Sequence, residues 1–151
     1  MKKLIIPIII ILSAIQLKAQ VQPDPAHWAY GVKKLTNNQY EVHLQCKIDT
    51  GWHIYAQKQT KDFIGTATKI TFAKTPGLQL AGTPVEHGKK DIYQIKAANI
   101  TNYEYAGTVD FVQKIIVKPE VKEVKVAIQY QTCTHKKCLP QANINLNVPL
   151  K

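Results

Sequence analysis

The sequence predicts an all-β fold, specifically an immunoglobulin-like antiparallel β-sandwich, on three observations. No window of a dozen residues combines the helical spacing of apolar residues with helix-capping residues. Short segments of alternating apolar and polar residues recur along the chain, and turn-forming residues separate them about every ten positions. The chain has 151 residues, enough for one such domain to bury its own core.

The first half of the sequence predicts four strands. Residues 28–35 and 40–48 form a hairpin, because both are rich in β-type residues and a polar turn separates them. A short strand follows at 52–55, after a turn that contains glycine. Residues 56–66 are polar and have no clear period, so they predict a loop, whereas alternation returns in a strand at 68–73.

The second half contains the longest strand that the sequence predicts. Residues 78–81 and 92–95 predict only short strands, and the glycine, proline and charged residues between them predict a loop over 82–91. At 108–118 the apolar residues recur at every second position, which predicts a long strand with one buried face. Two further alternating strands are predicted at 124–132 and 144–150.

Residues 1–19 have the layout of a secretory signal peptide, with two lysines, an apolar run and a cleavage context before Gln20. The apolar run is much shorter than the roughly 20 residues that a membrane-spanning helix needs. We therefore expect residues 20–27 to be a lead-in segment and residues 28–151 to be one domain. This domain is expected in the periplasm or otherwise exported, with no transmembrane segment in the mature chain.

The charge balance of the chain argues against nucleic acid as a partner. The sequence has 20 Lys+Arg and 10 Asp+Glu residues, a formal net charge of +10 at pH 7, and it contains no arginine. Nucleic-acid sites depend strongly on the bidentate guanidinium group of arginine. The excess of lysine therefore indicates solubility, or attraction to acidic surfaces and partners, and not a nucleic-acid interface.

Two of the three cysteines are close together in the sequence. Cys133 and Cys138 bracket four polar residues, with a β-type run before them and Leu-Pro after them. Strands that end at Cys133 and resume at Cys138 would form a hairpin whose facing Cα atoms lie about 4.5–5.5 Å apart, within the range of a disulfide. Cys46 falls on the apolar face of the strand at 40–48, which predicts a buried thiol.

The residues between the two cysteines favour thiol–disulfide exchange. A thiol reacts as its thiolate, and nearby cations lower its pKa. His135, Lys136 and Lys137 lie inside the loop and are therefore the candidates for tuning the pKa of Cys133 and Cys138. A ring of about six residues stabilises a protein by only about 2 kcal/mol in the chain-entropy model, so a purely structural disulfide would contribute little.

The residues alone leave two other roles for this loop open. Most cysteine pairs in exported domains are inert structural disulfides, which would leave the sandwich as a binding or assembly domain. Cys133, His135 and Cys138 also have the ligand types that suit zinc or copper, but the sequence nearby supplies no fourth ligand. We therefore expect no metal and no other cofactor.

Four short motifs together resemble the amino-terminal periplasmic domain of the thiol:disulfide interchange protein DsbD. They are Gly-Trp-His-Ile-Tyr at 51–55, Phe-Val-Gln-Lys at 111–114, Tyr-Gln-Thr-Cys at 130–133 and Cys-Leu-Pro at 138–140. The tyrosine-led cysteine pair that ends in Leu-Pro is the most specific part of this resemblance. The resemblance covers residues 28–150, nearly the whole of the expected domain.

The resemblance implies an immunoglobulin-like sandwich whose Cys133 and Cys138 cycle between dithiol and disulfide. In the family, the domain accepts electrons from the thioredoxin-like end of a membrane-embedded reductase. It then reduces periplasmic partners such as disulfide isomerases and cytochrome c maturation thioredoxins. Thioredoxin-like redox proteins and a membrane reductase are therefore the partners that the resemblance implies, with Cys138 as the cysteine that forms mixed disulfides.

The sequence departs from the family pattern in the region that shields the cysteines. Many members use an acidic and aromatic cap loop, whereas the corresponding region here, residues 82–91, carries Glu86 and His87 as its cap candidates and lacks the aromatic residue. The chain also has neither the transmembrane segments nor the thioredoxin-like domain of the whole protein-disulfide reductase. Whether the chain is itself an enzyme is therefore left open by the resemblance. We expect a stand-alone carrier that borrows a separate reductant, or a non-catalytic exported binding or assembly domain with a structural Cys133–Cys138 disulfide.

Overall fold

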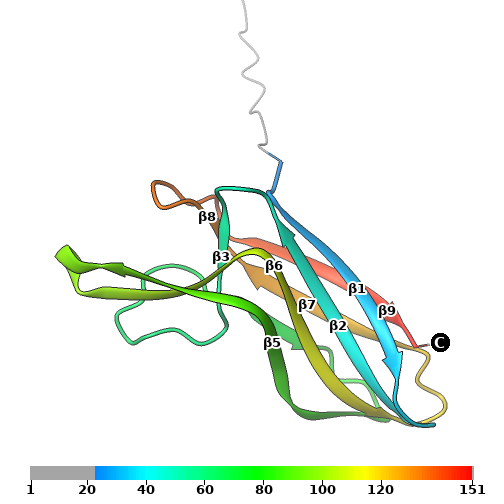
Figure 1. Ribbon diagram of the computed structural model, residues 1–151. Helices are drawn as coiled ribbons and strands as arrows, with labels where there is room; N and C mark the ends of the chain where they lie inside the picture. Colours follow the sequence, from blue (N-terminus) through cyan, green and yellow to red (C-terminus); the bar gives the residue numbers. More distant parts are fainter. Residues whose placement is uncertain (1–22, 151) are drawn as a thin grey trace, which may run out of the picture.

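The computed structural model describes residues 23–150, over which the chain forms two antiparallel sheets (Figure 1). This confirms the all-β sandwich, whereas the predicted signal peptide at 1–19 lies outside the described residues and stays a prediction. The first sheet contains β1 (Ala26–Lys34), β2 (Gln39–Ile48), β3 (His53–Tyr55), β5 (Leu78–Ile95), β6 (Ile100–Val117) and β8 (Thr132–Cys133). The second sheet contains β4 (Lys69–Phe72), β7 (Glu123–Tyr130) and β9 (Ala142–Pro149).

The long strand β6 organises the first sheet, in which the strand order is β1-β2-β6-β3-β8. The carboxyl-terminal part of β6 pairs with β2, and Glu104 and Tyr105 near its amino-terminal end pair with β3. Along its other side β6 pairs with β5, from the Leu78–Val117 pair to the Ile95–Ile100 pair. The short strands β3 and β8 are thus held beside the amino-terminal part of β6.

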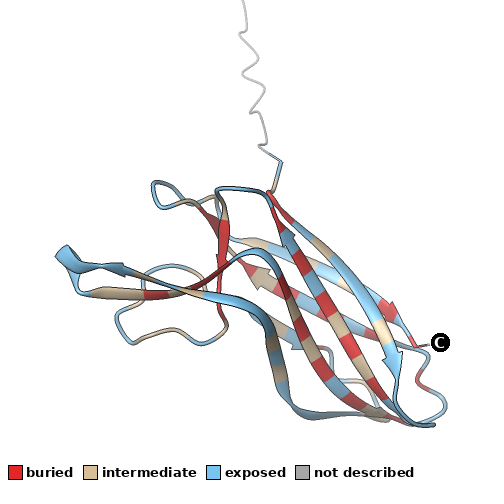
Figure 2. Cartoon of the chain, in the orientation of Figure 1, coloured by how far each residue is buried: buried red, intermediate tan, exposed pale blue. Residues whose placement is uncertain are grey.

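The core lies between the facing sides of the two sheets. Buried and exposed residues alternate along β2, β6 and β7, as strands with one solvent face require (Figure 2). Full burial of a Val, Leu, Ile or Phe side chain contributes about 1.5–3 kcal/mol each, which makes this alternation the main source of stability. The fully buried side chains include Val42, Leu44 and Cys46 of β2, Val109, Phe111 and Gln113 of β6, and Val124, Val126 and Ile128 of β7.

The prediction of a loop over 82–91 was wrong, because these residues form the middle of β5. The pairing of β5 with β6 shifts register between Ala81 and Val85 and again between Gly88 and Lys90. Such shifts mark β-bulges or irregular pairing, which accommodate glycine and re-aim a strand without ending it. Pro84 is tolerated because β5 lies at the edge of the sheet in the described part of the chain, where one side needs no backbone donor.

The β5–β6 hairpin extends beyond the sandwich on the same side as β8 (Figure 1). A single 3-10 turn, η1 (Lys96–Ala98), closes it, followed by Asn99 in the left-handed conformation with φ 54°. The segments that the sequence predicted as separate short strands at 78–81 and 92–95 are therefore the two ends of one strand. Residues 23–150 contain no helix of the length and apolar character that crossing a membrane requires.

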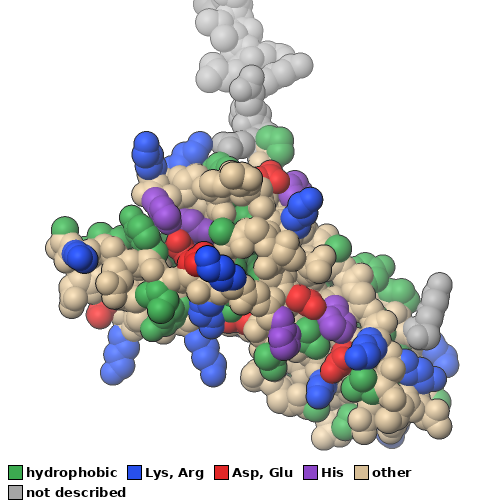
Figure 3. Space-filling model, viewed as in Figure 1, with side chains coloured by type: hydrophobic (Ala, Val, Ile, Leu, Met, Phe, Trp, Pro, Cys, Tyr) green, Lys and Arg blue, Asp and Glu red, His purple; other side chains and the backbone are tan. Residues whose placement is uncertain are grey.

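Lysine side chains are scattered over the face of the molecule that Figure 3 shows, with acidic and histidine side chains among them. They do not form one continuous basic stripe on this face. A phosphate backbone is bound through many closely placed cations. That nucleic acid is not a partner stays a prediction from the sequence.

Candidate functional site

Cys133 and Cys138 form a disulfide at the mouth of a tight hairpin. Their Cα atoms lie 4.0 Å apart, slightly closer than the spacing expected from the sequence, and the two residues form an antiparallel bridge. The hairpin is closed by hydrogen bonds from the Thr134 N–H to the Lys137 carbonyl at 2.7 Å and from the Leu139 N–H to the Thr132 carbonyl at 2.9 Å. The predicted cysteine hairpin is therefore confirmed.

The two sulfur-bearing residues differ in their exposure to solvent. Cys133 is 0% exposed on β8, where it pairs with His53 of β3. Cys138, at the far end of the loop, is exposed. A molecule that approaches the disulfide therefore meets Cys138, while Cys133 is covered by the sandwich.

A pocket of about 280 Å³ lies beside Cys138. The hydroxyl of Tyr55 lies 3.9 Å from Cys138 Sγ. Burial, reinforced by the charge of Glu104, raises the pKa of Tyr55, so its hydroxyl keeps the proton and can donate toward the sulfur. The pocket brings together residues from β3, β5, β6 and the cysteine hairpin: His53, Tyr55, Tyr93, Ile95, Asn102, Glu104 and residues 134–138.

The three residues predicted to tune the cysteines line this pocket together with Cys138. His135 stacks on Tyr93 with ring centroids 4.0 Å apart and planes inclined by 5°. The Nζ atom of Lys137 lies 5.4 Å from the centre of the Trp52 ring, a cation–π contact that keeps the ammonium near the hairpin. Lys136 is exposed on the loop. The structure therefore places His135, Lys136 and Lys137 around the same pocket as Cys138.

The structure brings neither Glu86 nor His87 to the cysteine hairpin. The Glu86 carboxylate accepts hydrogen bonds from the Gln57 backbone N–H at 2.6 Å and the Tyr105 hydroxyl at 2.8 Å. Burial raises the pKa of Glu86, but these bonds and Lys90, 2.9 Å away, outweigh it and leave the pKa below its usual value. His87 is exposed on β5. The β5 residues that line the pocket beside Cys138 are Tyr93 and Ile95 instead.

Sequence reasoning missed several residues of this site, among them His53, Tyr55, Tyr93 and Glu104. Tyr93 and Glu104 are diagonal neighbours across the β5–β6 hairpin only because of its register, which pairs Tyr93 with Asn102 and Asp91 with Glu104. His53 lies in the Gly-Trp-His-Ile-Tyr motif, two positions before Tyr55, and this spacing places both on one face of a strand. This alternation could have identified His53 as part of the site. A single sequence contains no pattern that would identify Tyr93 or Glu104.

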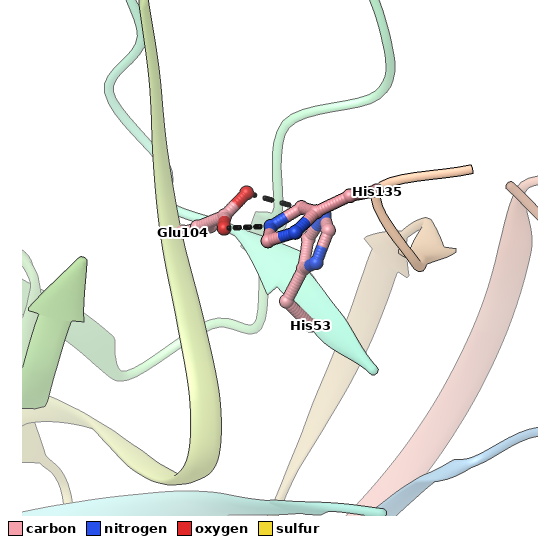
Figure 4. A group of neighbouring side chains, drawn as sticks. All are labelled: His53, Glu104 and His135. Carbon is pink, nitrogen blue, oxygen red and sulfur yellow. Dashed lines mark hydrogen bonds and ion pairs between the residues drawn. The ribbon is translucent and has the colours of Figure 1, made fainter. Parts of the chain in front are cut away.

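Metal-ligating side chains also meet in this pocket, in a different set from the one considered on the sequence. His53, Glu104 and His135 lie with one ligand atom each within 4.8 Å of one another (Figure 4). Burial has the largest effect on the pKa of His53 and lowers it, although the negative charge of Glu104 acts to raise it. The two cysteines that the sequence grouped with His135 are instead bonded to each other.

Comparison with known proteins identifies one matching family. The model of the family described as "Thiol:disulfide interchange protein DsbD, N-terminal" matches residues 18–148. No curated protein matches the sequence significantly.

Several solved structures are similar to the chain. The N-terminal periplasmic domain of ScsB from Proteus mirabilis has a TM-score of 0.61 and 16% identity, covering 84% of this chain and 47% of that one. The chain thus spans about half the length of that ScsB structure. The yeast GGA1 GAE domain has a TM-score of 0.51 and 10% identity, covering 85% and 95%. The N-terminal domain of DsbD from Neisseria meningitidis in the reduced form has a TM-score of 0.43 and 12% identity, covering 81% and 84%. At these identities, the ScsB and GGA1 domains show the fold alone.

Proposed function

The chain belongs to the family of N-terminal domains of the thiol:disulfide interchange protein DsbD, and from this we propose that Cys133 and Cys138 form its redox-active pair. Membership of this family implies a role in thiol–disulfide exchange. The observation that carries the assignment to these residues is the exposure of the disulfide. Cys138 is open to solvent beside a pocket, whereas Cys133, its bonded partner, is buried.

The difference in exposure supports a separate role for each cysteine. A thiolate of a reduced thioredoxin-like donor attacks Cys138 Sγ, the S–S bond breaks, and Cys133 leaves as the thiolate. The second thiol of the donor then attacks the mixed disulfide, which leaves the donor oxidised and releases Cys138. Two electrons and two protons have then moved from the donor to the Cys133–Cys138 pair.

Transfer to a target protein runs through the same atoms in reverse. The Cys138 thiolate attacks a disulfide of the target and forms a mixed disulfide while one target thiol leaves. Cys133 then attacks Cys138 Sγ, which restores the internal disulfide and releases the target with both thiols reduced. The resolving step is intramolecular, because both cysteines belong to one hairpin in which their Cα atoms lie 4.0 Å apart in the disulfide form.

The surroundings of Cys138 support its role as the nucleophile. Lys136 and Lys137 line the pocket and lower the free energy of a thiolate relative to a thiol. The Tyr55 hydroxyl can donate to the sulfur from 3.9 Å. Charge-assisted donation of this kind favours the ionised sulfur over the neutral one.

The size of the ring argues against a purely structural disulfide. Closing a ring of about six residues contributes only about 2 kcal/mol in the chain-entropy model. The buried faces of β2, β6 and β7 already supply a continuous core without the disulfide. The pair is therefore better explained by exchange than by the stability it adds.

The proposed partners are thioredoxin-like proteins in the periplasm. A membrane-embedded reductase with a thioredoxin-like end is the proposed electron donor, and disulfide isomerases or cytochrome c maturation thioredoxins are the proposed targets. The apolar segment at the amino terminus and the family match support export to this compartment.

The reduction potential of the Cys133–Cys138 pair tests the proposal. We expect equilibration with a thioredoxin or glutathione couple to give a value in the range of exchanging oxidoreductases, about −120 to −270 mV. A value below about −300 mV would identify a structural disulfide and favour a non-catalytic binding or assembly domain. Capture of a thioredoxin-like protein by a Cys133→Ala variant, and its absence with a Cys133→Ala/Cys138→Ala double variant, provides the matched control.

A further inference from the structure

His53, Glu104 and His135 converge from β3, β6 and the cysteine hairpin (Figure 4). The Nε2 atom of His135 lies 2.9 Å from Glu104 Oε1, and the Nε2 atom of His53 lies 3.2 Å from Glu104 Oε2. Each histidine therefore presents the same type of nitrogen to a different oxygen of one carboxylate.

The fold holds each of these side chains in place. Pairing of β3 with β8 sets His53 opposite Cys133, and pairing of β3 with β6 sets Glu104 opposite Tyr55. His135 comes from the hairpin loop, but its ring is fixed by stacking on Tyr93. Metal-binding histidines in proteins are typically oriented in this way by contacts outside the ligand set.

The pocket contains buried oxygen atoms that lack a suitable donor. Among the described residues, Glu104 Oε2 and Asn102 Oδ1 are buried without a hydrogen-bond partner, and both residues line the pocket. His53 is within ion-pair distance of Glu104 Oε2, but no aligned hydrogen bond joins them. The Glu104 side chain is only 7% exposed, and an incompletely paired carboxylate at such burial is costly. A cation between the three side chains would remove that cost.

We propose that His53, Glu104 and His135 bind a divalent transition-metal ion of the zinc type. Two imidazole nitrogens and one carboxylate oxygen form a ligand set that Zn²⁺ favours, with a fourth position left for water or a further side chain. Ligand atoms at about 2.1 Å from a tetrahedral Zn²⁺ lie about 3.4 Å from one another. One ligand atom of each of the three side chains lies within 4.8 Å of the other two, a spacing that side-chain rotations can reduce to this value.

The metal site does not depend on the redox chemistry, since neither cysteine belongs to the ligand set. Cys138 lines the same pocket, however, so a bound Zn²⁺ would add positive charge near its sulfur. A metal ion beside a thiol lowers the thiol pKa. The site would therefore couple metal binding to the reactivity of Cys138 through the pocket they share.

Titration of the untagged protein in its disulfide form with Zn²⁺ alone, followed by calorimetry, tests the proposal. In this form Cys133 and Cys138 are bonded to each other and Cys46 is buried, so thiols do not compete for the ion. We expect one equivalent of Zn²⁺ to bind. The affinity should fall at least tenfold in His135→Ala and in Glu104→Gln, since each loses one ligand.

The variants are chosen so that loss of a metal ligand can be distinguished from loss of the fold. The His135 side chain is 53% exposed in a loop, so its removal leaves the sandwich folded, and circular dichroism checks this for each variant. His27→Ala is the matched control, because His27 pairs with Asp49 at 3.0 Å on the exposed surface but belongs to no group of three ligands in residues 23–150. Absence of stoichiometric binding, or equal affinity in His135→Ala and the unmodified protein, would overturn the proposal. Neither result changes the reduction potential of the Cys133–Cys138 pair, so the proposed function is tested separately.

Discussion

The imidazole of His135 lies flat on the ring of Tyr93, with centroids 4.0 Å apart and planes inclined by 5°. This contact joins the cysteine hairpin to the projecting end of the β5–β6 hairpin. It is a link between segments some forty positions apart in the sequence, and it places an aromatic side chain over the pocket beside Cys138. The cap candidates Glu86 and His87 do not line this pocket, whereas Tyr93 and Ile95 of the same strand do.

Replacing Tyr93 by Ala should speed the reduction of the disulfide by dithiothreitol. A stacked aromatic pair contributes about 0.5–1.5 kcal/mol, so its loss predicts a rate increase of up to about tenfold through easier opening of the hairpin. Stopped-flow or quenched-flow measurement of the free thiols provides the rate. Tyr30→Ala, which removes a tyrosine that is 47% exposed on β1, should leave the rate unchanged. Equal rates in both variants would show that Tyr93 does not cover the pair.

Single-cysteine variants should differ sharply in thiol reactivity. Cys133→Ala leaves the exposed Cys138, which should react rapidly with Ellman's reagent, whereas Cys138→Ala leaves the buried Cys133, which should react at least tenfold more slowly. Each variant should lose about 2 kcal/mol of unfolding free energy with the disulfide. Labelling in denaturant, where both thiols are accessible, is the control. Similar rates in the two native variants would contradict the proposed division of roles.

Cys46 should take no part in exchange. It is 0% exposed within β2, and burial, together with the charge of Asp24, raises its pKa, so the thiolate is suppressed. In the reduced native protein, a bulky thiol reagent should modify the exposed Cys138 and leave Cys46 unmodified. Cys46→Ala should keep the reduction potential and cost about 1 kcal/mol of stability, as the loss of one buried methyl-sized group does.

Glu86 should make stability depend on pH in the acidic range. Its pKa in the folded protein lies below the usual 4.5, so its contribution is complete above that pH and is lost as the pH falls through the folded pKa. Glu86→Gln should lower the unfolding free energy at pH 7 by about 1.5–3 kcal/mol, since it weakens charge-assisted hydrogen bonds. Denaturant unfolding should show this difference shrinking below about pH 4.5.

An exposed acidic residue controls for the general effect of removing a charge. Glu123→Gln, at the solvent-exposed start of β7, should change stability by less than about 0.5 kcal/mol at either pH. A pH-independent difference for Glu86→Gln would instead show that shape, and not ionisation, is what Glu86 contributes.

Local patterns in the sequence were enough to predict much of the sandwich. Alternation of apolar residues at 40–48 and 108–118 identified the buried faces of β2 and β6, including the burial of Cys46, because a strand repeats every two residues whatever it pairs with. The Cys133–Cys138 hairpin was equally local, since both cysteines and the loop between them lie within six consecutive positions.

Only the tertiary structure decided what surrounds the cysteine pair. Residues 82–91 contain glycine, proline and charges that indicate a loop, yet β6 supplies a hydrogen-bonding partner that keeps them in a bulged edge strand. The same pairing carries Tyr93 to His135, while β3 and β6 bring His53 and Glu104 together. These contacts follow from the register between strands distant in sequence, and the residues themselves do not encode that register in any local pattern.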